Sequence, residues 1–304
     1  MRIVTDIKEA VLIKEPLACA YGYFDGMHLG HMKVINTTAG FGLKRAVVTF
    51  GNRPMSFISP SVAPDAIMSM EDKIKFMEQA GIDYLFIFDF NEKIMSMSRE
   101  DFVEGYMAEI NVKEAVVGFN YTFGRNKEGD CSNIKALCKK YGINVSIVKE
   151  AFYGSEPISS TLIRKALYSG DVVMASQMLG RPFYIKGKIN RGKQLGSRIG
   201  FPTANIETDS HILIPKWGVY ATKCTLEGRV YKGVTNVGNN PTVAKNSGLS
   251  VETHIIGFNG DVYGKELKIE FLFRIRPCIK FNGVDDLTEQ IGRDVKTVDE
   301  IYEI

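Results

Sequence analysis

Cysteine is scarce in this sequence, and the few that occur are scattered. The cysteines are Cys19, Cys131, Cys138, Cys224 and Cys278. Their number is odd and no two are spaced as Cys-x-x-Cys, so the pattern argues against both a disulfide framework and a zinc cluster. We therefore expect the protein to work in a reducing compartment.

Long apolar runs and strongly basic runs are also missing. No apolar stretch approaches the roughly 20 residues that a helix needs to span a bilayer, and the segment from Met1 to Asp6 is mixed and charged, unlike a secretory signal. Lysine and arginine total 38 against 35 for aspartate and glutamate, which is too balanced for a duplex-binding protein. These absences predict a cytoplasmic protein that binds neither a membrane nor nucleic acid.

Length and composition indicate two folded domains. The chain has 304 residues, of which 45% are hydrophobic and 24% are charged, and this is typical of a soluble protein with more than one ordinary core. The periodicity of apolar residues changes after Gly180-Arg-Pro182, from helix-like segments between short apolar runs to strand-like alternation. We predict one domain over residues 1–182 and a second over 183–304.

The order of elements predicts the fold class of each domain. In the first domain, strands are expected to begin near Leu17, Arg45, Tyr84, Ala115 and Val145, and helices are expected over 71–80, 98–110, 132–141, 159–168 and 171–179. This alternation predicts a Rossmann-like α/β domain with a parallel sheet covered on both faces. In the second domain, strands over 184–189, 219–224, 251–256 and 267–273, with a helix over 285–291, predict a small antiparallel β-barrel.

The first candidate site is Gly22-Tyr-Phe-Asp-Gly-Met-His28-Leu-Gly-His31, which holds two of the four histidines. It follows a predicted strand, and a helix is expected to start near its end. A helix N-terminus attracts phosphate, and Gly30 permits close approach of the backbone. From the residues alone, a His-x-x-His pair is also compatible with an incidental pair or part of a metal site, although no third ligand has a matching spacing.

Two further segments have polar residues suited to phosphate. Ile158-Ser-Ser-Thr161-Leu-Ile-Arg164 is either an ordinary helix cap with a surface arginine or a group of hydroxyls and a guanidinium that hold phosphate. The loop around Asn120, which runs from Val117 to Asp130, is either a structural turn or part of a ligand site. The residues by themselves leave both choices open.

Together these three segments resemble the nucleotidyltransferase superfamily, and especially bacterial FAD synthetases. The resemblance implies that the FMN phosphate attacks the α-phosphorus of ATP and pyrophosphate leaves, with no general base because that phosphate is largely dianionic at pH 7. It implies that His28, His31 and Arg164 are catalytic and, with Mg²⁺, supply positive charge. The residues implied to contact ATP or phosphate are Gly22, Phe24, Asp25, Gly30, Asn120, Ser159, Ser160 and Thr161.

Two positions depart from the pattern of this family. Leu162 stands where many relatives have an arginine, and Arg53 precedes Pro54 where a histidine is common. One cation is lost and one is exchanged, although a planar arginine side chain still suits phosphate. This leaves a protein with impaired adenylyl transfer as an alternative.

The second candidate site lies in the predicted barrel. The segment from Arg191 to Asn205 is rich in glycine and ends in Pro202-Thr-Ala-Asn205, so it is either a phosphate-wrapping loop or a set of barrel turns, and it contains no Walker motif. Pro-Thr-Ala-Asn, with the segments 233–242 and 251–255, resembles riboflavin kinases.

That resemblance implies a role for each matching residue. Thr203 and Asn205 would hold Mg²⁺ and the ATP phosphates through hard oxygen atoms. Glu252 would deprotonate the riboflavin 5′-hydroxyl, and His254 would support the site. Further implied phosphate contacts are Gly192, Lys193, Gly196 and Ser197, and the implied flavin contacts are Asn236 and Arg276.

Both resemblances together predict a bifunctional transferase of flavin cofactor biosynthesis. Riboflavin plus ATP would give FMN, and FMN plus ATP would give FAD, with Mg²⁺ bound alongside ATP and no tightly bound prosthetic group required. Self-association is left open. The alternatives are a riboflavin kinase with impaired adenylyl transfer, and a non-catalytic sensor of flavin or nucleotide.

Overall fold

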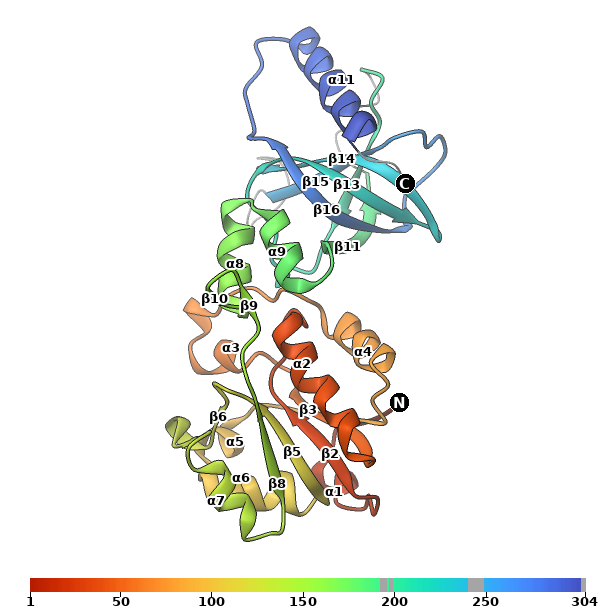
Figure 1. The fold of residues 1–304 in the computed structure, drawn as a ribbon. Coiled ribbons are helices and arrows are strands. Elements are labelled where there is room, and N and C mark those ends of the chain that lie inside the picture. The colour runs from red at the N-terminus through yellow and green to blue at the C-terminus, as the bar shows by residue number, and fades with distance from the viewer. Residues whose placement is uncertain (192–195, 197–198, 240–248, 302–304) are drawn as a thin grey trace. The chain divides into compact units, whose positions relative to one another are not determined.

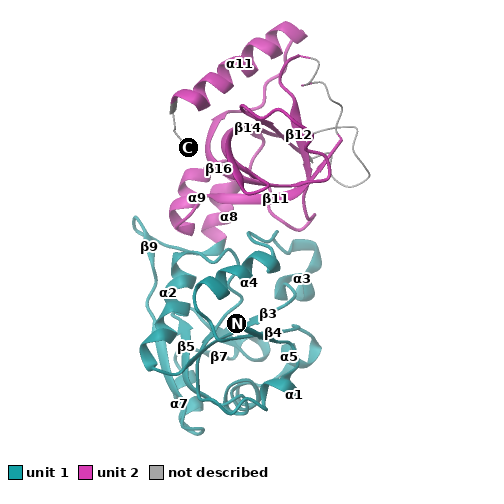
Figure 2. Ribbon diagram, turned by 90° about the vertical axis from the view of Figure 1, so that its right-hand side faces the viewer, with its two compact units in different colours: residues 1–160 teal, residues 161–304 magenta. Residues whose placement is uncertain are grey.

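The computed structural model describes residues 1–191, 196, 199–239 and 249–301. Contacts divide the chain into two compact units, Met1–Ser160 and Thr161–Ile304, which Figure 2 shows in different colours. The sequence suggested a boundary after residue 182. Helices α8 (Ser160–Ser169) and α9 (Val172–Leu179) therefore lie almost entirely in the second unit.

The first unit is built on a parallel sheet of six strands in the order β1-β4-β3-β2-β5-β8. The strands are β1 (Arg2–Val4), β2 (Leu17–Tyr21), β3 (Lys44–Phe50), β4 (Tyr84–Phe88), β5 (Val112–Gly118) and β8 (Asn144–Val148). Five of them were predicted, and β1 is an additional edge strand. From β2 the chain moves to β3 and β4 on one side and to β5 and β8 on the other, so the carboxyl ends of β2 and β5 form the topological switch point where such sheets bind ligands.

Helices cover both faces of this sheet (Figure 1). They are α1 (Ile7–Ala10), α2 (Leu29–Thr37), α3 (Pro54–Ile58), α4 (Met70–Gln79), α5 (Glu92–Ser96), α6 (Arg99–Val103) and α7 (Ile134–Lys139). One core packs α2 and α4 against Ala20 of β2, and the other packs α1, α6 and α7 against Cys19 and Tyr21. Successive side chains of β2 thus enter opposite cores, as expected for a strand buried on both faces. This confirms the predicted α/β class. The predicted helix 98–110 is α6 followed by a π-helical segment, Glu104–Ala108.

The second unit contains a closed antiparallel barrel in the strand order β11-β12-β15-β14-β13-β16. The strands are β11 (Phe183–Asn190), β12 (Thr203–Glu207), β13 (Gly218–Leu226), β14 (Arg229–Asn239), β15 (Leu249–Ile255) and β16 (Glu266–Arg276). The barrel prediction is confirmed, but β12 and β14 were not predicted as strands. In the barrel interior, the buried hydroxyls of Thr222 and Thr253 each lie within 2.9 Å of the Thr235 hydroxyl, so all three are satisfied.

Helix α11 (Val284–Ile301) lies across the outer face of the barrel (Figure 1) and is longer than the predicted helix 285–291. Its Val298 is fully buried against Val219, Ala221 and Val234 of strands β13 and β14. The helix therefore covers one part of the outer barrel surface and leaves a pocket beside it. Within the described part of the chain, no helix has the length and apolar character needed to cross a membrane.

Candidate functional sites

The histidine motif forms a tight loop between β2 and α2 in the first unit. Phe24 and Met27 are buried in left-handed conformations with φ of 54° and 45°, which cost non-glycine residues on the order of 1 kcal/mol each and persist only where packing enforces them. Only glycine fits at position 22, because the Cβ atom of any other residue would lie 2.8 Å from the Phe24 ring. The surrounding structure thus fixes this loop at the switch point.

Both histidines stand at the N-terminus of α2, as the sequence predicted. His28 is the N-cap residue, and its Nδ1 accepts a hydrogen bond from the His31 backbone N–H at 3.2 Å, so a neutral His28 ring has its proton on Nε2. The two rings stack with their centroids 3.5 Å apart. Gly30 allows this, since a Cβ atom there would lie 3.1 Å from the His28 ring.

The surroundings of His31 affect its charge. Burial lowers the pKa of His31 well below its usual value, and the neighbouring His28 and Lys73 lower it further. His31 is therefore neutral near pH 7 and offers hydrogen bonding without positive charge. The contact of His31 with phosphate stays a prediction, and hydrogen bonding is the interaction that a neutral ring can offer.

Lys73 of α4 is a buried cation that the sequence interpretation missed. The residue is 2% exposed. Its Nζ donates to the Tyr23 carbonyl oxygen at 2.6 Å and lies 4.1 Å from the Tyr23 ring centroid. The Thr49 hydroxyl donates to the same carbonyl at 3.0 Å. A signal was present, because Lys73 and the fully buried Met77 are four residues apart and share the apolar face of the helix.

The burial of Lys73 gives a prediction about stability and pH. Burial lowers the pKa of Lys73 from 10.5 to about 8, although Asp25 acts in the opposite sense. The folded state therefore disfavours the ammonium form of Lys73. Burying this charged form lowers the free energy of unfolding by its full amount below pH 8, and this loss disappears as the pH rises to 10.5. Relative to Lys73→Met, wild type is expected to gain about 3 kcal/mol of unfolding free energy between pH 7 and pH 10.5. Thermal unfolding followed by circular dichroism measures this difference.

Lys75 provides the matched control for this measurement. It lies on the same helix but is solvent-exposed and paired with Glu71. The difference between wild type and Lys75→Met is expected to change little over the same pH range. A difference for Lys73→Met that is equally flat would contradict the assignment of Lys73 as a buried cation.

Asp25 and Ser160 fix the loop to its surroundings. The Asp25 carboxylate accepts from the Ile67 backbone N–H at 3.1 and 3.2 Å, and the Asp25 carbonyl accepts from the Ser160 hydroxyl at 2.9 Å. Asp25 is 4% exposed. Both residues brace the histidine loop, and their contact with phosphate stays a prediction.

The other predicted residues of the first site fall on two segments. Asn120 is exposed just beyond β5, whose Val117 pairs with Tyr21 of β2, so it lies at the same sheet edge as the histidine loop. Ser159 precedes α8, and Thr161 and Arg164 lie on that helix in the second unit, where Thr161 is exposed and Arg164 is half-buried.

The two departures from the family pattern also have defined places. Arg53 precedes α3 and donates to the Pro64 carbonyl oxygen at 3.0 Å, so its guanidinium supports the loop after α3. Leu162 is half-buried on α8 in the second unit.

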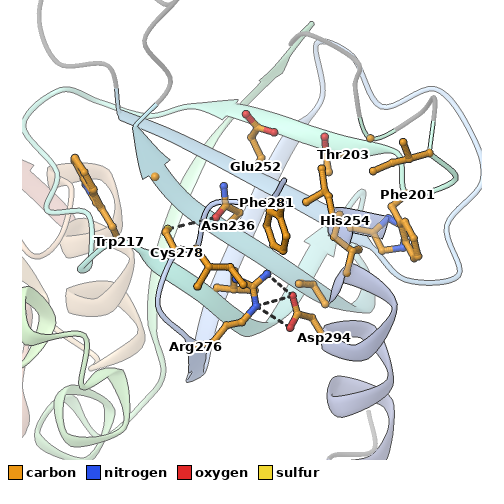
Figure 3. Close-up of a pocket in the computed structure, with 18 residues that line it drawn as sticks. Phe201, Thr203, Trp217, Asn236, Glu252, His254, Arg276, Cys278, Phe281 and Asp294 are labelled. Carbon is orange, nitrogen blue, oxygen red and sulfur yellow. Dashed lines mark hydrogen bonds and ion pairs between the residues drawn. The ribbon is translucent and has the colours of Figure 1, made fainter. Parts of the chain in front are cut away.

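The second unit has a pocket of about 450 Å³ between the outer barrel face, the segment after β16 and the first half of α11 (Figure 3). Strand register explains why Asn236, Glu252 and Arg276 meet in the pocket and why Asn205 lies beside Glu252. Asn205 pairs with Glu252, Glu252 with Asn236, Asn236 with Val219, and Val219 with Arg276. Because paired residues point to the same side of a sheet, one row of side chains crosses five strands. Asn205 and Glu252, which are 47 positions apart in sequence (252 minus 205), thereby become neighbours.

Thr203 and His254 occupy the neighbouring row. They pair across β12 and β15, and His254 Nδ1 lies 2.9 Å from the Pro202 carbonyl oxygen, with its ring edge-to-face against Phe201. His254 therefore holds the backbone just before Thr203. The sequence interpretation placed Thr203 and Asn205 at the end of a loop, whereas both lie on strand β12, which fixes their positions more firmly.

The glycine-rich segment before β12 is only partly described. Gly196 lines the pocket, and a Cβ atom there would lie 2.2 Å from the Phe201 carbonyl oxygen, so only glycine fits. The predicted phosphate contacts Gly192, Lys193 and Ser197 lie outside the described residues.

Arg276 lines the pocket but is held by Asp294 of α11. Its Nε lies 3.0 and 3.1 Å from the two Asp294 carboxylate oxygens, and its Nη2 lies 2.7 Å from one of them. Gln290 Nε2 donates to the same carboxylate at 3.0 Å. The predicted contact of Arg276 with flavin stays a prediction, but the arginine also fastens α11 over the barrel. Asp294 was missed, although it interrupts the apolar stripe Leu287, Ile291 and Val298 of α11.

This ion pair gives a second prediction about stability. The Asp294 side chain is 2% exposed, and its loss leaves the mostly buried Arg276 without its carboxylate. Asp294→Ala is expected to lower the unfolding free energy of the second unit by about 3 kcal/mol. Trp217 is the only tryptophan in the chain, so its emission during urea unfolding reports on this unit.

Glu289→Ala is the matched control on the same helix. It removes an exposed pair with Arg293, whose side chains are 68% and 64% exposed, and should cost about 0.5 kcal/mol or less. An equal cost for both variants would show that the Arg276–Asp294 pair does not fasten the helix.

The fold and the sites together define a class of protein. The first unit is a parallel sheet with a histidine-containing loop before a helix N-terminus at its switch point. The second unit is a closed barrel whose pocket is lined by a carboxylate together with hydroxyl and amide groups. This combination is that of a two-domain nucleotide-dependent transferase.

Comparisons with known proteins agree with this class. A family model described as FAD synthetase matches residues 12–162, and one described as riboflavin kinase matches residues 179–302. The bifunctional riboflavin kinase/FMN adenylyltransferase of Bacillus subtilis is 41% identical over 93% of this chain and 92% of its own length. The protein of the same name from Escherichia coli K12 is 30% identical over 95% and 94%.

The chain belongs to the bifunctional riboflavin kinase/FMN adenylyltransferase family. A crystal structure from Streptococcus pneumoniae, named as a macrolide-efflux protein, covers 99% of both chains with a TM-score of 0.89 at 28% identity, so the two-unit fold is shared over its full extent. The predictions of the family and of the fold class are confirmed.

Proposed function

We propose that this protein phosphorylates riboflavin to FMN in the barrel pocket and adenylylates FMN to FAD at the histidine loop. Its family membership establishes flavin cofactor biosynthesis as the process. The observation that best supports the assignment of chemistry to residues is the barrel pocket, which unites Thr203, Glu252 and Asn236.

The kinase reaction needs a base because its nucleophile is a neutral alcohol. Glu252 would accept the proton of the riboflavin 5′-hydroxyl while that oxygen forms a bond to the γ-phosphorus of ATP and the bond from γ-phosphorus to the bridging oxygen breaks, releasing ADP. Asn205 and Asn236 flank Glu252 in the same row. Their amides are suited to orient the carboxylate and the hydroxyl.

The metal proposed for this site is Mg²⁺. Thr203 and Asn205 lie two residues apart on β12, so a hydroxyl and an amide oxygen emerge on the same face of the barrel. Such hard oxygen donors fit magnesium, which usually retains waters and binds substrate phosphates as well. When bound, the ion neutralises charge on the ATP phosphates. Thr203 and Asn205 would fix the place where this happens.

The adenylyl transfer needs alignment and positive potential, but no base. An FMN phosphate oxygen forms a bond to the α-phosphorus of ATP, and pyrophosphate leaves when the bond to the bridging oxygen breaks. The backbone N–H groups at the N-terminus of α2 and the Nε2–H of a neutral His28 are the donors proposed to contact the phosphates. Lys73 adds a buried positive charge next to His31. Arg164 stays the proposed further cation.

The alternative of a kinase with impaired adenylyl transfer rests on Arg53 and Leu162. The Arg53 guanidinium donates to the Pro64 carbonyl oxygen, so this arginine supports the loop after α3. The relatives that match along most of the chain are nevertheless named as bifunctional, and both histidines are present. We therefore favour two activities over one, and over a silent sensor.

The direct experiment is an assay of both reactions with purified protein. Riboflavin with Mg-ATP should give FMN and then FAD, and FMN with Mg-ATP should give FAD and pyrophosphate, as resolved by chromatography of the flavins. FMN formation without any FAD would favour the single-activity alternative. Binding of flavin without turnover of either substrate would favour the sensor.

A further inference from the structure

Trp217, the only tryptophan in the chain, lies at one end of the barrel pocket and has no part in the chemistry described above. It is 51% exposed and lines the pocket together with Ile279, which is 47% exposed. A second hollow of about 440 Å³ lies on its other side, lined by Tyr168, Ile214, Pro215 and Lys216. Tyr168 is 50% exposed. Large aromatic surface is thus open to solvent between two concave regions.

The backbone that presents Trp217 is held firmly. Its carbonyl oxygen accepts from Arg274 Nη2 at 2.5 Å. The preceding Lys216 donates its N–H to the Leu167 carbonyl at 3.0 Å, and its own carbonyl accepts from the Tyr220 hydroxyl. A Cβ atom on Gly218 would lie 2.8 Å from the Arg276 carbonyl oxygen, so the strand start is closely packed. An exposed indole on a fixed backbone is a preorganised contact surface.

The position of Trp217 relative to Glu252 suits one part of the substrate. Trp217 has the same strand parity as Val219, which pairs with Asn236, which in turn pairs with Glu252, so the indole stands on the pocket face. Figure 3 shows Trp217 at the opposite end of the pocket from Thr203 and Phe201. The neighbouring Gly238 also lines the pocket and contributes no side chain to cover the ring.

We propose that Trp217 is a stacking platform for the isoalloxazine ring of riboflavin and sets the preference of the barrel for a flat tricyclic substrate. This rests on the proposed kinase function. Riboflavin must place its 5′-hydroxyl at Glu252, and its ring lies at the other end of the ribityl chain, away from the phosphate end at Thr203. Aromatic side chains prefer offset stacking on such rings. Trp217 therefore determines specificity while Glu252 performs the chemistry.

Steady-state kinetics of three variants test the platform. Trp217→Leu is expected to raise the KM for riboflavin about tenfold, which corresponds to about 1.4 kcal/mol, with the KM for ATP and the rate of FAD formation from FMN unchanged. Trp217→Phe keeps an aromatic face and should remain within about threefold of wild type. Tyr168→Leu is the matched control, since Tyr168 is equally exposed but lines only the second hollow.

The emission of bound riboflavin separates stacking from a merely structural role. Contact with an indole quenches flavin fluorescence. Riboflavin bound to wild type should therefore be almost non-fluorescent, and riboflavin bound to Trp217→Leu should be fluorescent. Unchanged KM and unchanged quenching in Trp217→Leu would overturn the platform while leaving the kinase function intact. If wild type itself does not phosphorylate riboflavin, the proposed kinase function is wrong, and the role of Trp217 that rests on it is wrong as well. A tenfold rise in KM for Tyr168→Leu would also overturn the assignment to Trp217.

Discussion

Replacing Glu252 by glutamine is expected to lower FMN formation by about 10²- to 10⁴-fold, the range typical of losing a general base. Glutamine has nearly the same shape and can still hydrogen-bond, but its amide cannot accept the proton of the riboflavin 5′-hydroxyl. Because Glu252 lies in the second unit, FAD formation from added FMN should be unchanged. Chromatography of flavins from separate riboflavin and FMN reactions measures both effects in the same preparation.

Asn236→Ala serves as the comparison for Glu252→Gln. Asn236 is the cross-strand neighbour of Glu252 and can orient the substrate but cannot act as a base at neutral pH. Its loss should reduce FMN formation less than the loss of Glu252. If Glu252→Gln retained most of its kinase activity, the base would have to be a different group, and the proposed role of Glu252 would be wrong.

Replacing His28 by alanine is expected to lower FAD formation from FMN by about 10²- to 10³-fold while FMN formation from riboflavin is unchanged. The expected size is that of losing one fixed hydrogen-bond donor to the charge that develops on transferred phosphate. His28 also caps α2 through Nδ1, and loss of a cap costs about 1 kcal/mol of stability. The alanine variant therefore combines a catalytic and a structural effect.

His28→Asn separates these two effects. Asparagine is among the best N-cap residues, so its side-chain oxygen can replace Nδ1 as acceptor for the His31 N–H, but it has no group at the place of Nε2. The asparagine variant should unfold at a higher temperature than the alanine variant and still lose most of its FAD synthesis. Full activity in His28→Asn would show that His28 acts only as a cap.

The fold was largely predictable because periodicity of apolar residues reports burial directly. The predicted strands β2, β3, β4 and β5 have buried residues on both faces, whereas the edge strand β8 is mostly half-buried. Strand β14 was missed for a physical reason. β14 contains Gly233, where a Cβ atom would lie 2.5 Å from the Cys224 sulfur, so close packing requires a residue that usually signals a turn.

The sites were predictable where a local motif brings the residues together, as at His28 and His31. They were less predictable where the important property is burial of a single polar side chain. Lys73 and Asp294 lie on otherwise apolar helix faces, and only the three-dimensional structure shows that each is 2% exposed. Trp217 escaped notice because an exposed aromatic residue before a strand has no motif. In each case tertiary contacts, which the sequence does not display, determine the role.

Mixing two single-site variants tests the central claim, that two reactions occur at two independent sites in one chain. Glu252→Gln and His28→Asn should each fail to convert riboflavin and Mg-ATP to FAD, because one makes no FMN and the other does not adenylylate it. Their mixture is expected to form FAD after a lag, since FMN released by His28→Asn diffuses to the intact adenylylation site of Glu252→Gln. No FAD from the mixture, although each variant retains its own remaining activity, would contradict the division of the chemistry between Glu252 and His28.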